Sequence, residues 1–243
     1  MSPNASPLLT VDGLVKRFGG FRALDLLSFS VGAGEVLGLV GPNGSGKTTC
    51  INVISGLYRP DGGAIHFEGR SIGGLASHRI VHAGINRTFQ VPRPFVTLTV
   101  RENVEIAIAY GRNRDQLRET DALLSSLNLT AFADKPAGQL NSAHQKMLDL
   151  ARALATGPRL LLVDELAAGL NPAELEHIAI KLKELARSGI ALLVVEHLMG
   201  FIDQITDRII VMNAGKEIFD GQLAEAFKNS QVVEVFLGDE NAA

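Results

Sequence analysis

The spacing of hydrophobic and polar residues changes twice along the chain, and each change predicts a different kind of structure. Near the N-terminus the two kinds of residue alternate, which predicts antiparallel strands at residues 8–14, 24–31 and 64–67, with a turn at Gly19-Gly20. Between residues 100 and 155 the pattern favours helices, at residues 100–110, 116–127 and 144–155. After Gly157-Pro158 it predicts strand, helix, strand and helix, at residues 160–163, 173–187, 190–195 and 198–204.

The last alternation predicts a mostly parallel sheet with helices on its faces, because parallel strands are joined by crossover connections. We therefore expect a single α/β domain over residues 1–243. Residues 1–90 and 157–243 would form its core together with the antiparallel part, and residues 91–156 would form an inserted α-helical subdomain.

A glycine-rich segment lies between a predicted buried strand at residues 35–40 and a predicted helix at residues 49–57. It fits the pattern G-x-x-x-x-G-K-[ST] and consists of Gly41, Pro42, Asn43, Gly44, Ser45, Gly46, Lys47 and Thr48. Glycines allow positive φ, so backbone N–H groups and the start of the helix surround phosphates. In such a loop the lysine reaches the β- and γ-phosphates, and the threonine hydroxyl ligates Mg²⁺. The flanking strand and helix argue against a chance match in a surface turn. We therefore expect a nucleoside triphosphate site, which also includes Thr49.

Two carboxylates, Asp164 and Glu165, follow the predicted strand at residues 160–163. The carboxyl ends of strands in an open α/β sheet face the ligand crevice. There Asp164 is suited to hold Mg²⁺, and Glu165 is suited to polarise an attacking water as a general base. The alternative is that both carboxylates cap the strand or pair with surface Lys or Arg; the phosphate loop favours the functional interpretation.

His197 and Gln90 also follow strand-like segments. His197 could hydrogen-bond the γ-phosphate and the attacking water, and the Gln90 amide could meet Mg²⁺ or that water. A single histidine or glutamine after a strand is more often structural. The residues alone therefore leave both interpretations open.

Composition and charge restrict the class of protein. The 243-residue chain has 23 Lys and Arg against 26 Asp and Glu, a net charge of −3, which gives no support to a nucleic-acid surface. The single Cys50 cannot form an internal disulfide and fits a reducing cytosol, and its position suggests helix packing. Residues 1–7 lack the features of a signal peptide, and the longest apolar runs are too short to span a bilayer. We expect a soluble chain.

Taken in order, the phosphate loop, Gln90, the Asp164-Glu165 pair and His197 resemble the ATP-binding subunit of an ABC transporter. Two further features fit the resemblance, which covers about residues 9–238: Leu170-Asn171-Pro172 is similar to the family's D-loop, and Phe18 lies where an aromatic stacks on adenine. The resemblance implies a P-loop NTPase core that binds ATP and Mg²⁺. It also implies that Glu165, His197 and Gln90 are catalytic, with Thr48, Gln90 and Asp164 at the metal.

Four segments of the sequence resemble one subgroup of this family, the branched-chain amino-acid importer ATPases. Relatives in this subgroup serve urea, amides and other small organic solutes. The four segments are residues 16–20, 87–90, 167–172 and 235–238. This subgroup implies head-to-tail dimerisation with another ATPase subunit, two transmembrane permease subunits and, indirectly, a solute-binding protein. It implies a peripheral location on the cytoplasmic face of the inner membrane, and no nucleic acid as partner.

The signature motif of the family, Leu-Ser-Gly-Gly-Gln, is replaced here by residues 140–144, and the proline after the catalytic glutamate by Leu166. Asn141, Ser142 and Ala143 would face the partner's ATP. Asn141 retains a donor and suits helix capping, whereas Ala143 adds a Cβ where glycine allows close approach. Tolerated drift in a homodimer is one explanation. The other, which we favour, is a heterodimer in which a sibling ATPase supplies the intact signature.

Two other classes of function are compatible with a phosphate loop. A non-transport ABC-type ATPase would act in complex assembly, translation or DNA repair, but the chain has one cassette, no sustained heptads and no basic surface. A P-loop kinase would phosphorylate a small molecule, and Glu165, His197 and the D-loop-like segment argue against it.

Overall fold

Two β-sheets organise the fold, which a computed structural model describes for residues 6–112 and 120–238. The first sheet is antiparallel, in the order β2-β1-β4-β5. Its strands are β1 (Leu9–Phe18), β2 (Phe21–Val31), β4 (Gly62–Phe67) and β5 (Arg70–Ser71). Phe18 pairs with Phe21 across the turn at Gly19-Gly20, so the predicted hairpin is confirmed.

The second sheet has six strands in the order β10-β9-β3-β8-β7-β6. Its strands are β3 (Val36–Val40), β6 (Ile85–Arg87), β7 (Leu160–Asp164), β8 (Ala191–Val195), β9 (Arg208–Asn213) and β10 (Lys216–Gly221). All neighbours are parallel except the antiparallel pair β9 and β10. The expected α/β fold, with a mostly parallel sheet beside an antiparallel one, is confirmed.

Both faces of the second sheet are buried at its central strands β3, β7 and β8, which explains why these strands are apolar at nearly every position. In β7, Leu161 and Val163 pack into a core with the helices α3 (Val100–Tyr110), α5 (Ser142–Ala155) and α6 (Pro172–Arg187). Leu160 and Leu162 point to the opposite face and pack into a core with the first sheet and helix α1 (Lys47–Ile54). Cys50 belongs to this second core; it is fully buried, and burial raises the pKa of its thiol to about 12. Its expected role in helix packing is confirmed.

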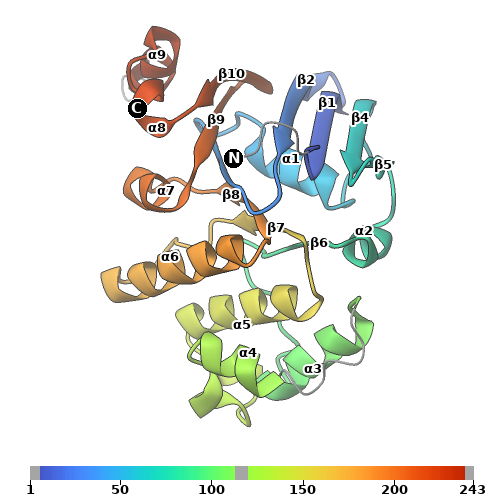
Figure 1. The fold of residues 1–243 in the computed structure, drawn as a ribbon, viewed down its shortest axis with the longest axis vertical. Helices are drawn as coiled ribbons and strands as arrows, with labels where there is room; N and C mark the ends of the chain where they lie inside the picture. Colours follow the sequence, from blue (N-terminus) through green and yellow to red (C-terminus); the bar gives the residue numbers. More distant parts are fainter. Residues whose placement is uncertain (1–5, 113–119, 239–243) are drawn as a thin grey trace.

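Helices cover the second sheet and extend beyond it (Figure 1). Those of eight or more residues are α1 (Lys47–Ile54), α3 (Val100–Tyr110), α5 (Ser142–Ala155), α6 (Pro172–Arg187) and α9 (Ser230–Gly238). Shorter ones are α2 (Ser77–Ala83), α4 (Thr120–Ser126), α7 (Met199–Ile205) and α8 (Leu223–Ala226). Helices α3, α4 and α5 lie together at the end of the molecule away from β10 (Figure 1).

Helix boundaries follow local capping. The Thr99 hydroxyl accepts a hydrogen bond from the Glu102 N–H at the start of α3, and the Glu102 carboxylate accepts one from the Thr99 N–H. Asn141 caps α5, which therefore begins two residues before the predicted start at His144. The predicted helix at residues 116–127 is α4 in its described part, and residues 116–119 lie outside the described residues.

Among the helices in residues 6–112 and 120–238, none combines the length and the apolar character that a membrane crossing requires.

Candidate ATP site

The phosphate loop joins β3 to α1, as predicted. Gly46 is the N-cap residue of α1 and has φ 107°, a left-handed conformation that favours glycine. A Cβ at Gly46 would lie 2.5 Å from the Ala23 carbonyl oxygen, so the loop packs against β2 too closely for any side chain here. This close packing fixes the loop at the start of α1, where helix N–H groups attract an anion.

Lys47 lies inside this loop. Its Nζ donates hydrogen bonds to the carbonyl oxygens of Gly41, at 2.7 Å, and Pro42, at 2.8 Å. Burial lowers the pKa of Lys47, and the carboxylates of Glu165 and Asp164 oppose this effect. The loop therefore holds a buried cation next to two acidic residues, where a phosphate chain would exchange carbonyl contacts for stronger anionic ones.

Asp164, the last residue of β7, forms a buried ion pair with Arg87, the last residue of the neighbouring strand β6. One guanidinium nitrogen lies 3.0 Å from Asp164 Oδ2, and Arg87 also donates to Asn52 Oδ1 at 2.5 Å. Burial raises the pKa of Asp164, and the Arg87 guanidinium opposes the rise. Arg87 was not predicted as a site residue, because its place beside Asp164 depends on the pairing of β6 with β7.

The second carboxylate oxygen of Asp164 tests whether the residues fit a metal ion. Asp164 Oδ1 is buried and accepts no hydrogen bond from any of the described residues. A buried carboxylate oxygen without a donor is costly unless a cation or a water occupies the place next to it. An oxygen ligand of this kind suits Mg²⁺, so the donor set fits the predicted metal.

The Glu165 carboxylate contacts the side chains of Gln90 and His197, the two other predicted catalytic residues. Gln90 Nε2 donates a hydrogen bond to Glu165 Oε2 at 2.5 Å, and His197 Nε2 lies 3.0 Å from Glu165 Oε1. Strands β6, β7 and β8 are neighbours, so the segments that follow them lie at one edge of the sheet. Glu165 itself has φ 48°, a left-handed conformation that costs a non-glycine residue about 1–2 kcal/mol.

A cavity of about 250 Å³ connects Glu165 and His197 to two aromatic rings. It is lined by Phe18, Phe21, Ala23, Asn43, Gly44, Gly46, Lys47, Thr48, Thr49, Glu165 and His197. Phe18 and Phe21 are 44% and 62% exposed, although both are large and apolar. Tyr58 contacts Phe18 edge-on, with ring centroids 5.2 Å apart. Phe21 and Tyr58 were not predicted; the hairpin pairing of Phe21 with Phe18 was the signal for the first of them.

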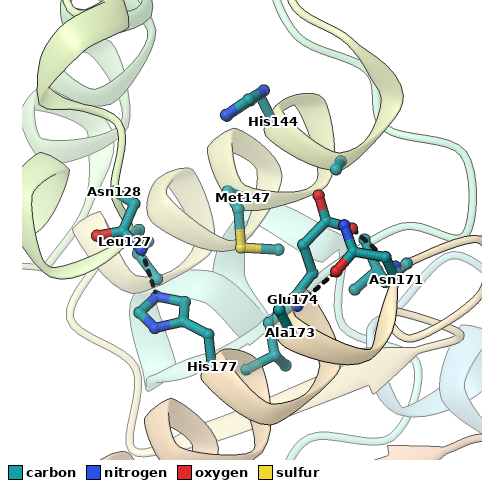
Figure 2. A pocket seen from close by; sticks show the side chains of 11 residues that line it. Leu127, Asn128, His144, Met147, Asn171, Ala173, Glu174 and His177 are labelled. Atoms are coloured by element: carbon teal, nitrogen blue, oxygen red, sulfur yellow. Dashed lines mark hydrogen bonds between the residues drawn. The ribbon is translucent and has the colours of Figure 1, made fainter.

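The three predicted signature residues do not line this cavity. Asn141, Ser142 and Ala143 lie at the start of α5, and Ala143 lines a separate, largely apolar cavity of about 280 Å³ between α5 and α6 (Figure 2). Asn141 Oδ1 accepts a hydrogen bond from the His144 N–H at 2.8 Å, and His144 Nδ1 lies 2.6 Å from the same oxygen. Because the oxygen faces the helix, the amide nitrogen of Asn141 is the end left for a ligand.

Residues 24–168 match the ABC transporter family, and they include the phosphate loop, Gln90, the α5 start and the Asp164-Glu165 pair. The chain belongs to the ABC transporter ATP-binding family. As a member of this family, it binds ATP and is an ATPase.

Relatives of this ABC ATPase match over nearly the whole chain. The high-affinity branched-chain amino acid transport ATP-binding protein BraF of Pseudomonas aeruginosa is 36% identical, over 96% of this chain and 98% of BraF. The probable branched-chain amino acid transport ATP-binding protein LivG of Archaeoglobus fulgidus is also 36% identical, over 97% of each chain.

Solved structures of ABC transporter cassettes have the same fold. A nucleotide-free cassette superimposes with a TM-score of 0.86 and is 31% identical, over 95% of this chain and 99% of its own. A dimeric cassette in a post-hydrolysis state, bound to ADP and phosphate, gives a TM-score of 0.80 at 26% identity, over 88% of this chain and 98% of its own.

Proposed function

We propose that this ABC ATPase hydrolyses Mg²⁺-ATP to power the import of branched-chain amino acids or related small organic solutes such as amides and urea. The observation that carries the hydrolytic part is the contact of Gln90 and His197 with the two carboxylate oxygens of Glu165, beside the phosphate loop. Similarity to BraF and LivG over nearly the whole chain supports the solute class.

In the proposed mechanism, one end of the cavity binds the adenine and the other end binds and hydrolyses the triphosphate. The Phe18 ring stacks on the adenine, and the phosphate loop with Lys47 binds the triphosphate. Glu165 takes a proton from the attacking water, which Gln90 helps to orient, and His197 hydrogen-bonds the γ-phosphate. Thr48, Asp164 and Gln90 would hold Mg²⁺, which supplies charge neutralisation as the bond to the leaving phosphate breaks.

A groove beside the Gln90 segment supports docking of a permease. The groove has a volume of about 650 Å³ and lies between α2, α3 and α5. Leu57, Phe95 and Tyr110 line it and are 51%, 47% and 74% exposed, an unusual state for large apolar side chains. We propose that residues 91–156 form the helical subdomain that two permease subunits contact, at the cytoplasmic face of the inner membrane, with a solute-binding protein on the other side.

The start of α5 supports a site that two ATPase subunits complete. Asn141, Ser142 and Ala143 lie outside the cavity of their own phosphate loop, and a related cassette is dimeric. We propose that these residues face the ATP of a partner subunit, and we favour a sibling ATPase with an intact signature as that partner. The isolated chain should then hydrolyse little ATP, and mixing it with the sibling should restore turnover. Full turnover by the pure homodimer, lost in Glu165→Gln, would refute the heterodimer.

Uptake into proteoliposomes tests the proposed function. The transporter is reconstituted with this ATPase, its permease subunits and its binding protein, with ATP inside the vesicles and labelled leucine, urea or an amide outside. We expect ATP-dependent accumulation of one solute, lost in Glu165→Gln and unchanged in Lys181→Met, which removes only a contact with Glu184 on the same helix. ATP hydrolysis without accumulation of any of these solutes would contradict import. Co-purification with ribosomes or DNA in place of membranes would favour a non-transport ATPase.

A further inference from the structure

Lys146 is a buried cation whose place is unusual for a helix residue. It lies in the second turn of α5 and is only 6% exposed. Its Nζ donates hydrogen bonds to three backbone carbonyl oxygens, those of Glu165 at 3.1 Å, Leu166 at 3.1 Å and Ala168 at 2.5 Å. An ammonium has three hydrogens, so this set uses all of them. One side chain of α5 therefore binds the segment that begins at the catalytic glutamate.

Glu196 holds the same segment from the other side. Its carboxylate accepts a hydrogen bond from the Ala167 N–H at 2.6 Å, and it is only 2% exposed. The Glu165 N–H donates to the Val195 carbonyl oxygen at 2.9 Å, which adds a contact from the end of β8. Peptide groups of residues 165–168 are thus held both by α5 and by the segment that carries His197.

The contacts of Lys146 and Glu196 hold the backbone of residues 165–168 in a conformation that it would otherwise leave. Glu165 has φ 48°, and such conformations persist only where surrounding contacts enforce them. A change in the orientation of the Glu165 peptide would move its carboxylate away from Gln90 and His197. Lys146 and Glu196 have opposite charges, and each charge offsets the cost of burying the other.

We propose that Lys146 and Glu196 are positioning residues that clamp the backbone of residues 165–168 and thereby direct the Glu165 carboxylate at the attacking water. Lys146 lies five positions after Asn141 on the same rigid helix. A displacement of the start of α5, when a partner's ATP engages it, therefore moves the clamp and the catalytic glutamate together. The inference rests on the proposed hydrolytic role of Glu165.

Replacement of Lys146 by a residue without an ammonium group tests whether ATP hydrolysis is impaired while ATP binding is kept. We expect Lys146→Met, measured in the complete transporter, to lower kcat for ATP about 10- to 100-fold, the usual effect of a misplaced catalytic group. Binding of a fluorescent ATP analogue should change less than about twofold, because Lys146 does not line the ATP cavity. Lys146→Arg, which keeps a cation of similar reach, should recover part of the lost rate. Lys181→Met is the matched control, since it removes a helix lysine whose Nζ donates to the Glu184 side chain and to none of these carbonyls.

Backbone hydrogen exchange supplies the second readout. Lys146→Met should accelerate exchange of the amides of residues 165–168 more than exchange of the amides of β7 and β8. It should also lower the thermal unfolding midpoint below that of Lys181→Met, because three carbonyl oxygens lose their donor and the buried Glu196 loses an opposite charge. Unchanged kcat together with unchanged exchange in these residues would overturn the clamp. A fall in ATP binding that parallels the fall in kcat would also overturn it. If the wild-type transporter itself hydrolysed no ATP, the proposed function would fail before the clamp is tested.

Discussion

The buried ion pair between Arg87 and Asp164 gives the sharpest stability prediction. The substitution Arg87→Met keeps the length of the apolar part of the side chain and removes the guanidinium. Asp164 would then lose its only ion-pair partner among the described residues, while its other carboxylate oxygen already lacks a donor. Asn52 and Ser55 would also lose the donor that Arg87 provides. The change leaves a charge uncompensated in the interior.

The size of the effect follows from the burial of both partners. Their side chains are 7% and 2% exposed, so solvent screens the pair little. Removal of one partner of such a pair costs about 3–5 kcal/mol, and we expect a loss of about 3 kcal/mol in the free energy of unfolding. With a denaturant dependence of about 3 kcal/mol per molar urea for a chain of this size, the midpoint should fall by about 1 M.

Urea unfolding followed by far-ultraviolet circular dichroism measures this shift. In an Asp164→Asn background the buried charge is absent, so adding Arg87→Met should cost only about 1 kcal/mol, and the two substitutions should not be additive. The control is Arg101→Met, which breaks an ion pair with the 77% exposed Asp121 and should cost under about 1 kcal/mol. An equal loss from Arg87→Met with and without Asp164→Asn, or a midpoint shift no larger than that of Arg101→Met, would refute the reasoning.

Three further predictions concern the loop, the adenine site and the clamp. Gly46→Ala places a Cβ 2.5 Å from the Ala23 carbonyl oxygen at φ 107°, and should destabilise the fold by about 2 kcal/mol and abolish ATP binding in a filter assay; ATP binding equal to that of the wild type would contradict the packing described for the loop. Phe18→Ala should weaken ATP binding about tenfold by loss of stacking, with triphosphate binding alone unaffected, as calorimetry would measure; an unchanged affinity would place the adenine elsewhere. Burial raises the pKa of Glu196 from 4.5 to about 7, while the Ala167 and His197 N–H groups and Lys146 oppose the rise. The folded state therefore binds more protons between these pH values, and stability falls as pH rises from 4.5 to 7. Glu196→Gln should remove a decline of about 3 kcal/mol in the free energy of unfolding over this pH range. Parallel curves of unfolding free energy against pH for the wild type and Glu196→Gln would show that this carboxyl does not titrate in that range.

Strands β3, β7 and β8 of the second sheet were predictable because each is a short apolar run buried on both faces. β7 and β8 differ from their predicted bounds by one residue at one end. β5 and β6 were not predicted as strands of definite length, because runs of two and three residues leave no periodicity to recognise. β9 and β10 escaped prediction although the middle of β9 is as buried as the central strands. The pairing of β9 with β3, a long-range contact, fixes its place beside the central strands.

Some residues of the site were likewise predictable from the sequence, and others were not. The phosphate loop, Asp164 and Glu165 carry local signals, since each has a residue pattern directly after a strand. Arg87 and Lys146 carry none: one reaches Asp164 across 77 positions, and the other reaches the Ala168 carbonyl oxygen across 22. Such contacts depend on which strands are neighbours and on how α5 packs against the sheet. The left-handed conformation of Glu165 could not be predicted from the sequence either, because a glutamate gives no signal for a positive φ.

The central claim is that Glu165 activates water for ATP hydrolysis at the edge of the sheet. The most direct measurement is phosphate release in a single turnover, with ATP prebound to the wild-type protein or to Glu165→Gln in the assembled transporter. We predict equal ATP affinity and release at least about 100-fold slower in Glu165→Gln, as expected when a general base is removed. Release at the wild-type rate from Glu165→Gln would contradict the account.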